Sequence, residues 1–131
     1  MILSFSRDSF ATDILSGKKK HTIRADKGNR WKAGRTIHFW RGNPRNVNGK
    51  NKPYQFATGV VSKVEHIEIT YPTSYLNDAV IKVEGRALTL DEQIELAHND
   101  GFEHLIELLL FFKEDFSGKL MHFDDVKPIN G

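Results

Sequence analysis

The stretch Gly17-Lys18-Lys19-Lys20-His21-Thr22-Ile23-Arg24 joins a predicted helix to a predicted strand. Before it, residues 9–16 carry Phe10 and Ile14 on one helical face, which predicts a short amphipathic helix that ends at the glycine of the stretch. Residues 21–25, which include the last four residues of the stretch, are expected to form a strand. Burying so much charge would be costly, so we expect the stretch to line a wet surface or a pocket for an anionic or polar ligand.

The sequence on either side of this stretch predicts a mixed α+β protein. Thr89 and Glu92 form a capping box for a helix that runs to Asp100, and a second apolar helix follows it. Alternating or β-branched residues predict strands over 2–6, 35–41, 55–70, 79–84 and 118–123. Strands in the first two thirds with helices in two places favour a small mixed β-barrel with flanking helices.

Length and composition favour one domain over residues 1–131, large enough for a single core. No apolar run has the length of a membrane span, and residues 1–5 resemble a first strand more than a signal peptide, so no membrane partner is expected. The absence of cysteine excludes disulfides, zinc thiolate sites and a cysteine nucleophile. A cytoplasmic location fits this composition, and the oligomeric state is left open.

The net charge of +2 conceals an asymmetry between the two parts of the chain. Residues 1–53 hold thirteen Lys and Arg against three Asp, whereas residues 54–131 hold six Lys and Arg against fourteen Asp and Glu. Either the basic half faces an anionic partner such as RNA, or the acidic half neutralises it within the fold. The six histidines show no metal-binding spacing, and no nucleotide-binding or nucleophile-elbow motif is present, so neither metal nor cofactor is expected.

Lys19 and Thr22 form a candidate pair of base and nucleophile. A desolvated lysine loses its proton more readily and can activate a neighbouring hydroxyl group. In a regular strand these two residues would face opposite sides, so Lys19 must lie in the turn before the strand, while Thr22 and Arg24 share one strand face. Cations also favour the end of a helix, which would explain one or two of the three lysines without any ligand.

Asp100 is the candidate acid. It lies at the end of the helix that begins at Thr89, where the helix dipole disfavours a negative charge, as suits a general acid. The competing interpretation is that Asp100 and Glu103 form a capping box for the next helix, and local sequence favours this second interpretation.

The candidate ligand-binding residues are basic or aromatic and lie near this stretch or in the basic region after it. Trp31 is expected either to stack on a base or to pack in the core. The complete set of candidate substrate-binding residues is Arg24, Lys18, Lys20, His21, Trp31, Arg41 and Arg45.

Several short motifs resemble the ASCH domains of the PUA-like superfamily, in an order that spans nearly the whole chain. The chain contains Ile14-Leu15-Ser16-Gly17, then Thr22-Ile23-Arg24, and then Trp31-Lys32-Ala33-Gly34. Asp100-Gly101-Phe102 and a closing segment, Gly118-Lys119-Leu120-Met121-His122-Phe123, are similar to motifs of the second half of the family. The resemblance implies a small PUA-like β-barrel with flanking helices that recognises RNA or a modified nucleoside.

One branch of this family consists of small amidohydrolases that remove the acetyl group of acetylcytidine with a Lys, a Thr and a Glu. By motif position the resemblance implies the catalytic set Lys19, Thr22 and Asp100, in which the chain has Asp where those enzymes have Glu. Lys19 would activate Thr22, Thr22 would attack the amide carbonyl, and Asp100 would handle the leaving-group proton. Arg24 would orient the substrate or stabilise the oxyanion.

Two other functions remain open at this point. The first is a non-catalytic RNA-binding module that uses the same surface together with Arg41, Arg45, Lys50 and Lys52. The second is a nuclease, which the lack of a metal constellation or paired histidines disfavours.

Overall fold

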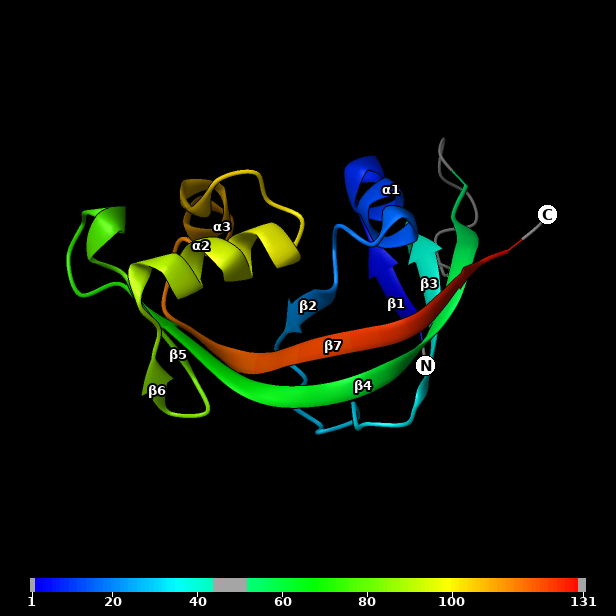
Figure 1. The fold of residues 1–131 in the computed structure, drawn as a ribbon, viewed down its shortest axis with the longest axis horizontal. Coiled ribbons are helices and arrows are strands. Elements are labelled where there is room, and N and C mark those ends of the chain that lie inside the picture. Colours follow the sequence, from blue (N-terminus) through cyan, green and yellow to red (C-terminus); the bar gives the residue numbers. More distant parts are fainter. Residues whose placement is uncertain (1, 44–51, 130–131) are drawn as a thin grey trace.

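The computed structural model describes residues 2–43 and 52–129 and shows a mixed α+β protein with a seven-stranded sheet (Figure 1). Three α-helices and one short 3-10 helix accompany the strands in these residues. In chain order the elements are β1 Ile2–Phe5, α1 Asp8–Ser16, β2 His21–Arg24, β3 Thr36–Arg41, β4 Tyr54–Thr70, η1 Leu76–Asp78, β5 Val80–Val83, β6 Arg86–Ala87, α2 Leu90–Asn99, α3 Leu105–Phe112 and β7 Phe116–Pro128.

The long strands β4 and β7 form the spine of the sheet. They pair antiparallel from Ala57 opposite Pro128 to Ile69 opposite Phe116. On the other edge of β4, β3 pairs with its first half and β5 with its second half. The sheet continues from β3 to β1, which runs parallel to it, from β5 to β6, and from β7 to β2.

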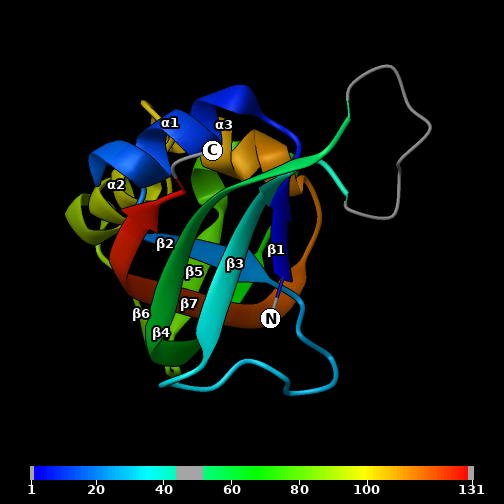
Figure 2. The same cartoon turned by 90° about the vertical axis from the view of Figure 1, so that its right-hand side faces the viewer.

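The sheet curls strongly, so that β2 and β7 cross behind β3 and β4 (Figure 2). Within the part of the chain that the structure describes, the strand pairing ends at β1, at β2 and at β6, and the sheet does not close. The predicted mixed α+β class is therefore confirmed, whereas the predicted closed barrel is not.

All three helices lie on the concave side of the bent β4–β7 pair (Figure 1). α1 ends where Gly17 adopts a left-handed conformation with φ of 86°, as glycine does without steric cost, and this confirms the predicted helix end. Thr89 and Glu92 form the predicted capping box of α2. No helix among the described residues is both long and apolar enough to cross a membrane.

The hydrophobic core lies between the helices and the curled sheet. Its fully buried side chains come from sequence-distant strands and helices, as the long-range sheet pairing requires. The largest include Ile14, Ile37, Phe39, Ile67, Ile69, Ile81, Phe102, Leu108 and Met121. This core fixes β2 against the ends of α1 and α2, where the candidate site lies.

Candidate functional site

The turn that contains Lys19 and Lys20 contacts the end of α2, although the two are far apart in the chain. The backbone N–H of Lys20 donates to the carbonyl of Asn99 at 2.7 Å, and the backbone N–H of Lys19 donates to the carbonyl of Asp13 at 2.9 Å. Lys19 precedes the first residue of β2, so it lies in the turn as expected. The turn thus connects the C-terminal ends of two helices, whose free carbonyls need such donors.

Lys19 and Asp100 form a buried pair at this junction. Lys19 has 2% of its surface exposed and Asp100 has 4%. Lys19 Nζ donates to the backbone carbonyl of Asp100 at 2.6 Å and lies 3.3 Å from Asp100 Oδ1. Burial lowers the pKa of Lys19, although the charge and the hydrogen bond of Asp100 act in the opposite direction.

The expected capping role of Asp100 is wrong. α3 begins at Leu105, and its N-cap is His104, whose backbone N–H donates to Glu107 Oε1 at 3.1 Å. Asp100 is instead the C-cap of α2, and its carboxylate faces Lys19 and His21. The long-range contacts with Lys19 and His21 take the place of a local cap, and the sequence around Asp100 gives no sign of them.

Thr22 and Arg24 lie on one face of β2, as expected from strand geometry. Arg24 Nε donates to Thr22 Oγ1 at 3.4 Å, and Arg24 Nη2 donates to the carbonyl of Ser4 at 2.8 Å. Arg24 therefore bridges β1 and β2, two of the strands at which the open sheet ends. Burial lowers the pKa of Arg24, whereas the charge of Asp100 acts to raise it.

A cavity of about 210 Å³, here called the site cavity, collects these groups. Lys19, Thr22, Arg24 and Asp100 all line it. No hydrogen bond joins Lys19 to Thr22 within the described part of the chain.

Phenylalanine rings form the apolar wall of the site cavity. The Nζ of Lys19 lies 4.6 Å from the centre of the Phe10 ring, and the guanidinium carbon of Arg24 lies 4.8 Å from the centre of the Phe5 ring. The complete aromatic wall is Phe5, Phe10, Phe102, Phe111 and Phe112. None of these rings was expected in the site, because the helical periodicity assigned Phe10 to an apolar helix face.

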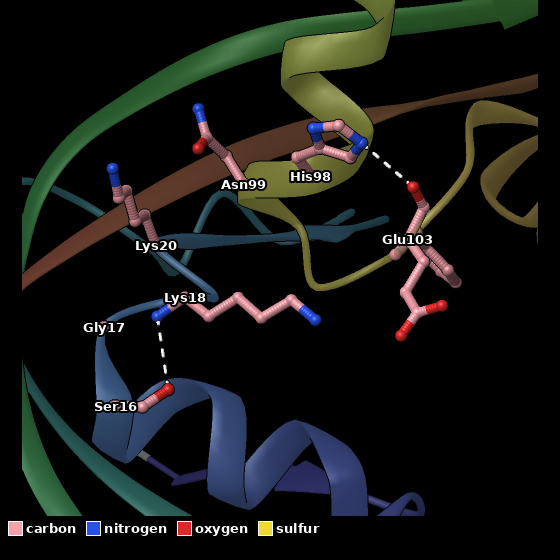
Figure 3. Close-up of a pocket in the computed structure, with 8 residues that line it drawn as sticks. Ser16, Gly17, Lys18, Lys20, His98, Asn99 and Glu103 are labelled. Atoms are coloured by element: carbon pink, nitrogen blue, oxygen red, sulfur yellow. Dashed lines mark hydrogen bonds between the residues drawn. The ribbon is translucent and has the colours of Figure 1, made fainter.

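Lys18 and Lys20 lie on a different surface. They line an open groove between the ends of α1 and α2, here called the lysine groove, with Asn99, His98 and Glu103 on its other wall (Figure 3). Both lysines are exposed. Their position beside two helix C-termini fits the helix-dipole explanation, because cations stabilise those ends.

The remaining candidate residues are dispersed. Trp31 packs in the hydrophobic core, and its backbone N–H donates to Asp26 Oδ2 at 3.1 Å. Arg41 ends β3, where it pairs in register with Phe5 and Tyr54. Arg45 and Lys50 fall outside the described residues.

His21 is buried and contacts Asp100. Its Nδ1 lies 3.0 Å from Asp100 Oδ1, and its ring packs edge-on against His122 with the ring centres 5.3 Å apart. His21 and His122 line a second cavity of about 360 Å³, which also contains Glu65 and is here called the second cavity. The sequence placed His21 near the ligand but did not indicate this contact with Asp100.

One cluster of side chains has the composition of a metal site. Glu103, His104 and Glu107 place their ligand atoms within 4.8 Å of one another at the start of α3. Two of these residues are exposed, and exposed carboxylates commonly gather in this way without an ion. The sequence analysis missed the cluster because its spacing matches no metal motif.

The site cavity combines a buried lysine of lowered pKa, a hydroxyl group, a carboxylate, a guanidinium group and aromatic rings. Groups of these kinds can act as base, nucleophile, acid and oxyanion donor in acyl transfer. Comparisons with known protein families, with curated proteins and with solved structures found no match.

Proposed function

We propose that the protein binds a modified nucleoside, free or within RNA, in the site cavity and hydrolyses an N-acyl amide of the acetylcytidine type there. The convergence of Lys19, Thr22 and Asp100 supports this proposal above all. These residues approach one cavity although Lys19 and Asp100 are 81 positions apart in the chain. A merely solvated basic surface would not require Lys19 to be buried.

Lys19 serves as the base in this proposal. Because burial lowers its pKa, Lys19 releases its proton more readily than an exposed lysine does. The neutral amine takes the proton of Thr22 Oγ1 while that oxygen forms a bond to the acyl carbon. Arg24, which already donates to Thr22 Oγ1, is placed to stabilise the negative charge that develops on the carbonyl oxygen.

Asp100 carries the proton to the leaving group. Lys19 Nζ lies 3.3 Å from Asp100 Oδ1, so the proton taken from Thr22 can pass through the carboxylate to the departing amine as the C–N bond breaks. The acyl group then remains on Thr22 as an ester. Attack of water on this ester releases the free acid and restores the hydroxyl group, so that the reaction consumes only substrate and water.

The size and lining of the site cavity suit a single base. Pockets for drug-sized ligands measure about 300–1,000 Å³, whereas the site cavity measures about 210 Å³. An acylated base fits this scale, while the ribose and any attached RNA would remain outside. The phenylalanine wall offers faces on which a base can stack.

We include membership of the ASCH family in this proposal. Lys19, Thr22 and Asp100 occupy positions that resemble its motifs, and the hydrogen bond from Arg24 to the Ser4 carbonyl, which links β1 and β2, supports a barrel-like arrangement of the open sheet. The chain has Asp where the amidohydrolases have Glu, and the distance of 3.3 Å between Asp100 Oδ1 and Lys19 Nζ supports a role for this shorter side chain.

Incubation with acetylcytidine and with RNA that contains it tests the proposal. We expect acetate release, loss of release in Lys19→Met and Thr22→Ala by at least about 100-fold, and retention of activity in Thr22→Ser. Lys27→Met, which removes an exposed lysine from a loop, is the matched control and should behave as wild type. No release from several acylated nucleosides or from acylated RNA would refute hydrolysis.

A non-catalytic RNA-binding module is the second candidate, and the two exposed lysines of the lysine groove favour it. This function predicts RNA affinity that falls steeply with salt but is unaffected by Thr22→Ala. Tight salt-dependent binding without turnover would therefore select it over the hydrolase.

A further inference from the structure

His21 has a polar side chain in a buried position, which is energetically unfavourable. It has 2% of its surface exposed, and its Nε2 is fully buried without a hydrogen-bond partner among the described residues. Leaving a buried polar atom unpaired is energetically unfavourable. A residue kept at this cost is expected to provide something else, and its other ring nitrogen contacts Asp100.

Two groups hold the same oxygen of Asp100. His21 Nδ1 lies 3.0 Å from Oδ1, and Lys19 Nζ lies 3.3 Å from it. By contrast, Oδ2 has no hydrogen-bond partner in the described residues and is not among their fully buried unpaired atoms. Asp100 lines the site cavity, and Oδ2 is the carboxylate oxygen without a partner in the described residues, so it is the one left to contact a ligand there.

The ring of His21 packs against a second histidine, His122. His21 pairs in register with His122 on β7, and the two rings meet edge to face. His122 Nε2 lies 2.7 Å from Glu65 Oε1 on β4. Contacts therefore run from Glu65 through His122 and His21 to Asp100, across three neighbouring strands.

We propose that His21 is a positioning residue: its Nδ1–H donates to Asp100 Oδ1 and thereby turns Oδ2 toward the substrate, while His122 and Glu65 hold the ring in place. This inference rests on the proposed function of the site cavity. It also fixes the tautomer of His21, because a proton on Nδ1 of the neutral ring leaves Nε2 as the bare nitrogen.

Two substitutions of His21 separate positioning from packing. His21→Asn keeps an N–H donor near the place of Nδ1, whereas His21→Leu keeps bulk and loses the donor. With acetylcytidine we expect His21→Leu to lower kcat by about 10–100-fold with little change in KM, and His21→Asn to recover most of the loss. His66→Asn, at a half-buried histidine whose Nε2 also contacts a carboxylate, is the control and should match wild type.

Equal loss in His21→Asn and His21→Leu, or full activity in His21→Leu, would refute the inference. Thermal unfolding of each variant shows whether a loss reflects misfolding. Nitrogen-15 NMR of the histidine rings provides a test that needs no substrate: wild type should show His21 protonated at Nδ1 and bare at Nε2, and Asp100→Ala should abolish that preference. Protonation at Nε2 in wild type would overturn the inference, even if acetylcytidine proves not to be a substrate.

Discussion

Gly118 on β7 connects the stability of the sheet to the candidate site. A Cβ atom at this position would lie far inside van der Waals contact with the backbone carbonyl oxygen of Arg24, and 2.7 Å from the Phe116 ring. The ring can turn, but the carbonyl belongs to β2, which pairs with β7 one residue further along, at Lys119. Gly118→Ala must therefore displace β2 or break its pairing.

The expected cost of Gly118→Ala is large for the addition of one methyl group. Overpacking costs about 1–3 kcal/mol and more where the backbone must move, so we expect about 3 kcal/mol. A domain of this size loses roughly 3–5 °C in Tm for each kcal/mol, which gives a decrease of about 10 °C. Arg24 moves with β2, so acetate release from acetylcytidine should fall as well.

Thermal and urea unfolding of Gly118→Ala measure this cost, with Gly28→Ala as the matched control. A Cβ at Gly28 would meet only the flexible side chain of Arg30, at 3.4 Å. That substitution should leave Tm unchanged or raise it, because alanine restricts the unfolded chain. Hydrogen exchange should become faster in β2 of Gly118→Ala alone. A Tm of Gly118→Ala within about 2 °C of wild type would correspond to a loss of less than about 1 kcal/mol in the free energy of unfolding. Such a result would refute the close approach of β7 to β2.

Two further predictions concern the buried polar groups. Asp100→Asn leaves Lys19 buried without its counter-charge and should lower the free energy of unfolding by about 3 kcal/mol in urea titrations; a loss below about 1 kcal/mol would contradict a charged pair. Burial lowers the pKa of His122, against the effect of its hydrogen bond to the Glu65 carboxylate, so the unfolded chain binds more protons at this residue. Its contribution to stability is complete above about pH 6.5 and falls as the pH drops below that value. His122→Gln should therefore flatten the pH dependence of unfolding in this window, and equal slopes in the two proteins would contradict the shift. The carboxyl pKa of Glu65 lies below its usual value of 4.5, because hydrogen bonds and charge from His122 and Lys63 outweigh burial, so Glu65 titrates outside the window.

Local signals in the sequence predicted most of the elements. Residues 9–16 and Gly17 indicated α1 and its end, and Thr89 with Glu92 indicated the start of α2, because caps and periodicity are properties of neighbouring residues. β7 was predicted only over 118–123 but extends from Phe116 to Pro128. Several of its added residues, Ser117, Asp124 and Lys127, are polar or charged, and they become part of the strand by pairing with β4, which is a tertiary effect.

The candidate site was predictable only in part for the same reason. Strand alternation placed Thr22 and Arg24 on one face, and the turn placed Lys19 before the strand. Asp100 was expected to act as a cap, because its true partners lie about eighty positions away. The contact between His21 and His122 likewise depends on the register of β2 against β7, which the sequence of either strand does not specify.

The pairing of β2 with β7 also has a consequence for the order of folding. β2 receives its backbone partners from residues about a hundred positions further along the chain, at His21 opposite His122. Contacts of such long sequence separation form slowly, because the intervening chain must be ordered first. We therefore expect the site cavity, which holds Thr22 and Arg24, to assemble after the local contacts of α1 and of the paired strands β3 and β4.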